Sequence, residues 1–276
     1  MKEFTRIQGP EPFPDRPPNA LSGLASRLDR VHALAGVLAL GLTAYLAIEP
    51  TQNWLLLLLC ALAALGTDGV VRTHPHARFH SIDDTALFLF VPVLFTFALG
   101  IFLEEVAGGH LTVLLGLASA VPYWLIIRAE FESVDRASED FHYHRLILNI
   151  ATYVIAFLFF ATIFDFDLSL TSSAFAAGIV SLLLAIEVLR EEAMDTPRTV
   201  TYAIAVGVLL AETAWTTHFL PFESSPAAVF LLLAFYLMTG LMHSYLANRL
   251  NPRTAGEFAV VAMAGLLIVT VSHTYI

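Results

Sequence analysis

The sequence contains very little cysteine and lysine, and each shortage excludes classes of protein. Cys60 is the single cysteine of the 276 residues, so the chain forms neither an internal disulfide nor a Cys-X-X-Cys metal or redox motif. Lys2 is the single lysine, which excludes a Walker A phosphate-binding loop and a retinal-carrying lysine inside a membrane. The HExxH motif of metalloproteases and the GxSxG motif of serine hydrolases are absent as well. The chain therefore carries none of these familiar sites.

Charge is scarce throughout the chain. Only 14% of the residues are charged and 57% are hydrophobic, whereas a soluble domain carries roughly 25% charged residues. The fourteen basic residues form no dense basic patch, so no nucleic-acid partner is expected. The apolar residues gather in runs of about 20, the length that crosses the hydrocarbon core of a bilayer. The sequence therefore predicts an all-α, polytopic transmembrane helical bundle whose partner is the lipid bilayer.

Nine of these apolar runs are predicted to cross the membrane, within one domain that covers residues 31–276. The first 30 residues hold five prolines among charged residues, which predicts a disordered tail. Small residues in the sixth run predict a close contact with another helix. These are Ser173, Ala174, Ala177 and Gly178. The predicted spans are Val31–Ile48, Trp54–Val71, Thr85–Leu103, Leu111–Ile127, Leu146–Phe164, Leu170–Leu189, Thr199–Leu220, Ala227–Ala247 and Phe258–Tyr275.

The basic residues predict how the chain is threaded. All fourteen lie in the N-terminal tail or in the connections after the second, fourth, sixth and eighth spans. The remaining connections hold only acidic residues among their charged side chains. Because basic connections stay in the cytoplasm, the N-terminus is predicted to be cytoplasmic and, after nine spans, the C-terminus lies outside. The expected location is a bacterial cytoplasmic membrane.

Two of the basic connections also gather histidines and carboxylates, which suggests a metal site. Neutral imidazoles and carboxylates are ligands for zinc, iron or manganese. A divalent metal there would activate water against a lipid or polyprenyl substrate at the cytoplasmic leaflet. The alternative is that these residues are solvated and screen the neighbouring arginines, because their spacing is not diagnostic. The candidate ligands are His74, His76, His80 and Asp83 in one connection and His142 and His144 in the other.

Glu212 suggests a second and different function. It lies inside the seventh predicted span, past the midpoint toward the outer side. An ionisable residue there is costly and usually faces the bundle interior. One hypothesis is a proton-coupled transporter in which Glu212 titrates and His218, near the outer end of the same span, extends the proton relay. The other is a protonated Glu212 that hydrogen-bonds to a hydroxyl or carbonyl group of a neighbouring span.

Histidines near the helix ends leave a third interpretation open. His32 and His243 lie near the inner ends of spans, and His218 and His273 lie near outer ends. Either pair has the residue type that ligates a b-type haem between helices. Histidines at such positions also occur as ordinary interfacial residues. The sequence thus establishes a membrane protein and leaves its activity open.

Overall fold

The structure is a computed structural model that describes residues 20–48, 51–77, 79, 84–106, 109–166, 168–190, 196–220, 222–247 and 251–275. The described chain is helical and contains no strand, as the sequence predicts. The proline-rich residues 1–19 lie outside these ranges, and helix α1 begins at Ala20, before the predicted start of the first span. The helices are α1 (Ala20–Ala47), α2 (Asn53–Val71), α3 (Ala86–Val106), α4 (His110–Ala118), α5 (Ala120–Glu132), α6 (Phe141–Asp165), α7 (Leu170–Leu189), α8 (Thr196–Thr217), α9 (Ser224–Leu246) and α10 (Pro252–Tyr275).

Eight spans in the described chain are long and apolar enough to cross a membrane, which confirms a multi-pass bundle. One of them, His110–Glu132, consists of α4 and α5 with Ser119 between them. The interruption lies one turn before Pro122, which has no N–H to donate to the carbonyl of Ala118. The ninth predicted span is also helical as α10, but its described apolar stretch is the shorter Gly256–Leu267.

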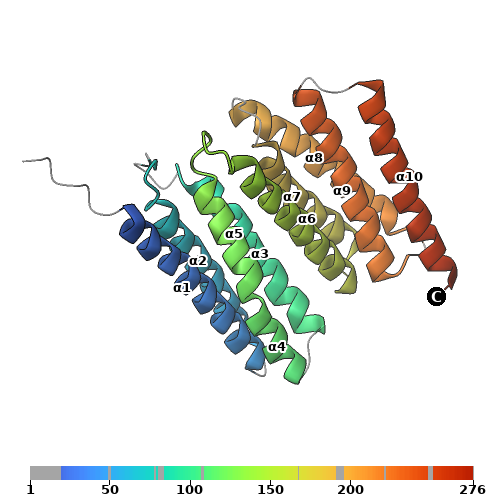
Figure 1. Cartoon of the computed structure of the whole chain (residues 1–276). Coiled ribbons are helices and arrows are strands. Elements are labelled where there is room, and N and C mark those ends of the chain that lie inside the picture. The colour runs from blue at the N-terminus through green and yellow to red at the C-terminus, as the bar shows by residue number, and fades with distance from the viewer. Residues whose placement is uncertain are drawn as a thin grey trace, which may run out of the picture.

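The helices form two groups side by side, α1–α5 and α6–α10 (Figure 1). In the first group, α1 packs against α2, α4 and α5. In the second group, α9 packs against α6, α7, α8 and α10. Helix α6 joins the groups, because it also packs against α3 and α5. The contacts of α6 with α3 and α5 therefore help to hold the two groups together.

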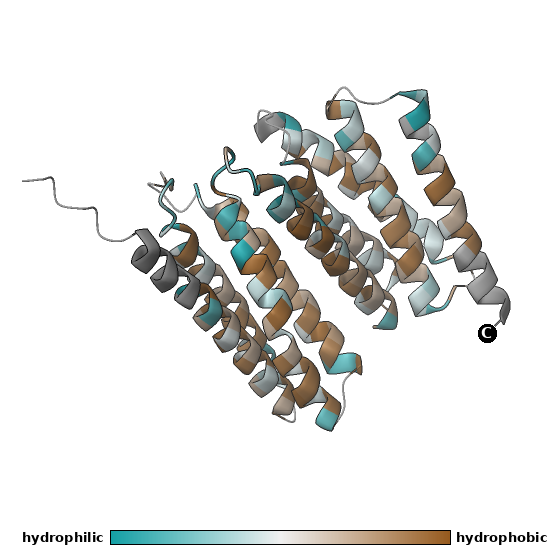
Figure 2. Cartoon of the chain, viewed as in Figure 1, coloured by the Kyte–Doolittle hydropathy of each residue, from teal (hydrophilic) through white to brown (hydrophobic). Residues whose placement is uncertain are grey.

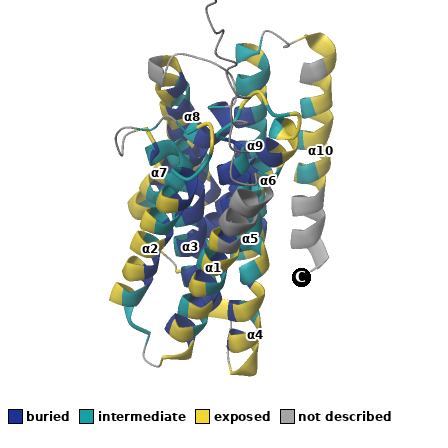
Figure 3. Ribbon diagram, turned by 60° about the vertical axis from the view of Figure 1, so that its left-hand side comes forward, coloured by how far each residue is buried: buried dark blue, intermediate teal, exposed yellow. Residues whose placement is uncertain are grey.

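The exterior of the bundle is apolar, as expected of a surface in contact with lipid (Figure 2). Leu57, Leu65 and Phe175 are 62%, 68% and 69% exposed on the outward faces of their helices. Buried residues line the middle of the bundle (Figure 3), where Tyr45, Phe160 and other large side chains fill the space between helices. The hydrophobic pattern therefore separates a largely apolar outer surface from a packed core.

The helix ends alternate between two ends of the bundle. The start of α1 and the ends of α2, α5, α7 and α9 lie together, and we call this end the arginine-bearing end (Figure 1). Arg72, Arg128 and Arg190 lie there, in agreement with the predicted hairpin threading. Its assignment to the cytoplasm remains a prediction from the distribution of basic residues.

Among the described helices, α7 and α8 share the most extensive contact. A Cβ atom added to Gly178 would lie 2.9 Å from the Cβ of Ala211 and 3.1 Å from the carbonyl oxygen of Gly207. A Cβ added to Gly207 would lie 2.8 Å from the carbonyl oxygen of Gly178 and 2.8 Å from the Cβ of Leu182. The small residues predicted in this span thus allow two backbones to touch, which confirms the expected close approach.

Candidate functional site

Four charged side chains meet between α5, α6 and α7 at the arginine-bearing end, and we call them the charge cluster. Its members are Glu130, Arg145, Glu187 and Arg190. Arg145 Nη1 donates to Glu187 Oε1 over 2.8 Å, and Arg145 Nη2 donates to the Glu187 carbonyl oxygen over 3.0 Å. Arg190 Nη2 lies 2.9 Å from the same Glu187 Oε1 and 3.5 Å from Glu130 Oε2. One carboxylate thus holds two guanidinium groups.

The charge cluster is buried. The side chains of Glu130 and Glu187 are 0% and 1% exposed, and those of Arg145 and Arg190 are 3% and 12% exposed. Removing such groups from water costs several kcal/mol per ion unless each is paired with good geometry. Burial alone would lower the pKa of Arg190, but Glu187 and Glu130 outweigh it and hold that pKa above its ordinary value. Arg190 therefore stays charged.

Local helix geometry explains how the charge cluster assembles. Glu187 and Arg190 are three residues apart at the end of α7, so they lie on one face of the helix. Helix α6 begins at Phe141, five residues before the predicted span, which places Arg145 on a helix rather than in a loop. Glu187 and Arg190 lie at the end of α7 but are buried there, because α5 and α6 cover them.

A small cavity adjoins the charge cluster, and we call it the arginine cavity. Its volume is about 130 Å³, and it is lined by Leu87, Phe88, Ser133, Val134, Arg136, Phe141, Arg145 and Arg190. The Arg190 guanidinium lies over the Phe88 ring, 4.8 Å from its centroid. Two buried nitrogen atoms, Arg190 Nη1 and Arg145 Nε, have no hydrogen-bond partner within the described chain. The cavity therefore offers donors to an acceptor-rich group.

The structure brings the two histidine-bearing connections together at one point. His76 Nδ1 lies 2.8 Å from Asp135 Oδ2, and the His74 ring packs edge-on against Phe131 with centroids 4.8 Å apart. The backbone N–H of Ala137 and the side chain of His76 lower the pKa of Asp135. The ionised Asp135 carboxylate therefore stabilises the folded protein at pH values above the pKa that it has in the unfolded chain. This stabilisation is lost as the pH falls through the lower pKa that it has in the folded protein.

The other predicted metal ligands separate. His142 and His144 lie on α6, two residues apart, so their side chains point in different directions. His142 is exposed, whereas His144 is buried with its Nδ1 3.0 Å from the carbonyl oxygen of Asp140. No group of three or more His, Cys, Asp or Glu side chains among the described residues is placed to hold a metal ion. His80 and Asp83 lie outside the described residues, and the metal site stays a prediction.

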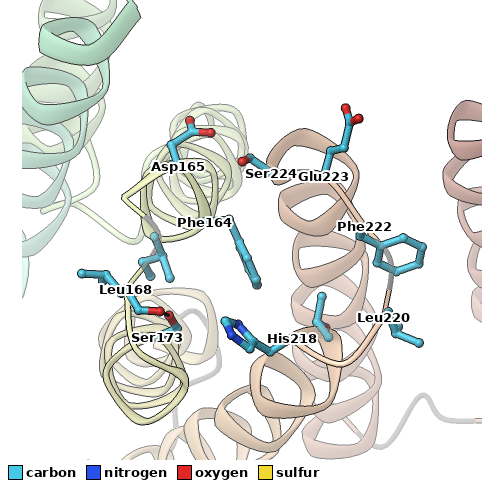
Figure 4. Close-up of a pocket in the computed structure, with 11 residues that line it drawn as sticks. Phe164, Asp165, Leu168, Ser173, His218, Leu220, Phe222, Glu223 and Ser224 are labelled. Atoms are coloured by element: carbon cyan, nitrogen blue, oxygen red, sulfur yellow. Dashed lines mark hydrogen bonds between the residues drawn. The ribbon is translucent and has the colours of Figure 1, made fainter. Parts of the chain in front are cut away.

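Glu212 and His218 lie on different faces of the region where α8 ends. Glu212 is exposed on the outside of the bundle. His218 lines a cavity of about 380 Å³ at the end opposite the arginine-bearing end, and Glu212 is not among its lining residues. In Figure 4, His218 and Phe164 point into this cavity, while Asp165 lies at its edge. The proton relay through Glu212 and His218 stays a prediction without a contact that joins them in the described structure.

A third cavity lies between α5 and α6, and we call it the α5–α6 cavity. Its volume is about 300 Å³, and it is lined by Trp124, Leu125, Arg128, Asp140, Tyr143, His144 and Ile147. The Arg128 guanidinium lies 5.2 Å from the centre of the Trp124 ring. His32, one of the histidines considered for haem, packs instead against Trp124 with ring centroids 5.7 Å apart. Two cavities with cationic side chains therefore occupy the arginine-bearing end.

Together these features define a multi-pass helical membrane protein with a buried charge cluster near one end of its helical bundle. The chain matches, over residues 33–272, the family described as "Protein of unknown function (DUF5656)", and it belongs to that family. No curated protein and no solved structure matches the chain. The matched region begins in α1 and ends in α10, so it contains the charge cluster and all three cavities.

Proposed function

We propose that this membrane protein binds an anionic lipid at the arginine-bearing end, with the lipid phosphate in the arginine cavity. The observation that carries the proposal is that three arginines line this one cavity: Arg136, Arg145 and Arg190. Arginine matches phosphate well because its planar fork presents several N–H donors to the phosphate oxygens. A phosphate would accept from the buried Arg190 Nη1, which has no partner within the described chain.

The balance of charge supports an anionic ligand. In the charge cluster two carboxylates offset two guanidinium groups, so the cluster is neutral when all four are ionised. Arg136, an exposed residue at the cavity, adds a further positive charge. Glu130 and Glu187 hold the two buried guanidinium groups in place before a ligand arrives, which lowers the ordering cost of binding.

The size and lining of the arginine cavity support a lipid rather than a large soluble ligand. At about 130 Å³ it is smaller than the about 300–1,000 Å³ of sites that enclose drug-sized molecules. It therefore suits one polar group of a larger ligand. Leu87, Phe88, Val134 and Phe141 supply apolar lining beside the arginines, which suits the adjoining glycerol and chains of a lipid.

The expected orientation supports a lipid of the inner leaflet. From the positive-inside rule we expect the arginine-bearing end at the cytoplasmic side of the membrane, which we expect to be a bacterial cytoplasmic membrane. Anionic lipids in a cytoplasmic leaflet attract basic residues at the membrane surface by about 1 kcal/mol for each arginine or lysine. A lipid ligand agrees with the lipid or polyprenyl substrate suggested by the sequence. The binding proposed here uses arginines, whereas the hypothesis from the sequence uses a metal.

Replacing Arg136 with glutamine tests the proposal. The purified, delipidated protein should bind short-chain phosphatidic acid more tightly than the diacylglycerol with the same chains. Arg136→Gln should weaken binding of phosphatidic acid by roughly tenfold or more, because a charge-assisted hydrogen bond contributes about 1.5–3 kcal/mol. Native mass spectrometry of the protein in detergent would measure both ligands.

Arg253→Gln is the matched control, because Arg253 is 91% exposed on α10, outside the arginine cavity. This variant should bind phosphatidic acid like the wild type. Equal binding of diacylglycerol and phosphatidic acid, or unchanged binding in Arg136→Gln, would refute the phosphate site. Inorganic phosphate that binds as tightly as the lipid would instead show that the ligand is a soluble anion.

A further inference from the structure

The α5–α6 cavity has a lining that differs from that of the arginine cavity. It contains one arginine, Arg128, and one carboxylate, Asp140, together with two aromatic side chains, Trp124 and Tyr143. Its volume of about 300 Å³ falls at the lower limit of small-molecule sites. Tyr143 is 63% exposed, so the cavity opens to the surroundings of the bundle. A ligand that carries one negative and one positive charge fits this lining better than a simple anion.

Hydrogen-bond donors on α5 form one part of the α5–α6 cavity. Arg128 Nε and Trp124 Nε1 are buried, and neither has a hydrogen-bond partner within the described chain. The two residues are four apart on α5, so they lie on the same face of the helix. His32 of α1 packs against the Trp124 ring and helps to fix it. A phosphate group, which presents only acceptor oxygens when ionised, would satisfy both donors.

Acceptors on α6 form another part of the same cavity. His144 Nδ1 lies 3.0 Å from the carbonyl oxygen of Asp140, which can only accept, so Nδ1 carries the hydrogen. In the neutral ring Nε2 is then an acceptor. The Asp140 carboxylate lines the cavity beside this ring. A primary ammonium group, with three N–H donors, is the complementary partner.

We propose that the α5–α6 cavity binds a zwitterionic phospholipid whose headgroup carries a phosphate and a primary ammonium group, as in phosphatidylethanolamine. The phosphate accepts from Arg128 and Trp124, and the ammonium group donates to Asp140 and His144. Phosphatidylcholine fits less well because its quaternary nitrogen has no N–H to donate. Phosphatidylglycerol fits less well because it has no positive charge for Asp140. This site is separate from the arginine cavity and does not depend on the proposed function.

Titration of delipidated protein in detergent with short-chain phospholipids of identical acyl chains tests this site. Phosphatidylethanolamine should bind about tenfold more tightly than phosphatidylcholine or phosphatidylglycerol, since a charge-assisted hydrogen bond is involved. Asp140→Asn should lower the ratio between phosphatidylethanolamine and phosphatidylcholine affinities several-fold, because the amide no longer offers an anionic acceptor to the primary ammonium group. Arg128→Gln should weaken the binding of all three lipids by about tenfold.

Arg136→Gln is the control variant, because Arg136 lines the arginine cavity and does not line the α5–α6 cavity. It should leave the preference for phosphatidylethanolamine over phosphatidylcholine unchanged, although it weakens the binding of phosphatidic acid. Equal affinity for phosphatidylethanolamine and phosphatidylcholine would overturn the proposal, as would an unchanged ratio in Asp140→Asn. Soluble phosphoethanolamine binding as tightly as the lipid would overturn the assignment to a lipid. Thermal unfolding without lipid would verify that each variant is folded.

Discussion

Replacing Glu187 with leucine is expected to lower the free energy of unfolding by about 3–5 kcal/mol, the usual cost of breaking a buried ion pair from one side. Glu187 Oε1 accepts hydrogen bonds from both Arg145 and Arg190, and its side chain is 1% exposed. Without it, two guanidinium groups remain buried, and only Glu130 is left in the charge cluster to offset them. Chemical unfolding of the purified protein in detergent micelles would measure the loss.

Two further variants determine whether buried charge causes this loss. Glu257→Leu removes the acid of an exposed pair with Arg253, and it should change stability by less than about 1 kcal/mol. Arg145→Leu combined with Glu187→Leu removes one charge of each sign, so it should recover part of the stability lost in Glu187→Leu. If Glu187→Leu unfolds like the wild type, the charge cluster does not stabilise the bundle.

The second large effect is expected at the contact between α7 and α8. Gly207→Leu should destabilise the protein by at least about 1–3 kcal/mol, the usual cost of inserting extra methylene groups into a packed core. The first added carbon alone would lie 2.8 Å from the carbonyl oxygen of Gly178. A backbone atom cannot rotate away as the end of a side chain can, so the helices must separate.

Gly36→Leu is the matched control for this change. Gly36 is also a glycine within a membrane-spanning helix, but a Cβ atom added to it would meet nothing within 4 Å. This variant should unfold at nearly the wild-type temperature in a thermal melt followed by circular dichroism. Equal melting temperatures for Gly207→Leu and the wild type would show that α7 and α8 do not need to touch.

The fold was largely predictable because its signals are local. A run of apolar residues long enough to cross a bilayer is read directly from the chain, and the predicted span Leu170–Leu189 coincides with α7. The glycine contact was also partly predictable, since small residues with helical spacing identify a close helix face. The sequence did not indicate that Gly207 would be the partner of Gly178, because that choice depends on which helices become neighbours.

The candidate site was less predictable because its residues are distant in the sequence. Arg145 and Glu187 are separated by 42 positions, and each alone resembles a charged residue at a membrane boundary. What could have indicated their burial is the position of Glu187 inside an apolar run, three residues before Arg190. The metal site suggested by the histidines of the connections stays a prediction. Two of its candidate ligands, His142 and His144, are separated because they lie two residues apart on α6 and point in different directions.

The separation of the cluster in sequence also has a consequence for how the chain is made. Arg190 follows Glu130 by 60 residues, so at about 5–20 residues per second a ribosome needs roughly 3–12 s to supply it. During that interval we expect Glu130 to remain at the water-accessible membrane surface, because Arg190, its ion-pair partner in the finished bundle, has not yet been made. A water-soluble carbodiimide should label Glu130 in chains stalled before α6 and spare it in the full-length protein. The end of α5 would then be among the last parts of the first helix group to reach its final depth.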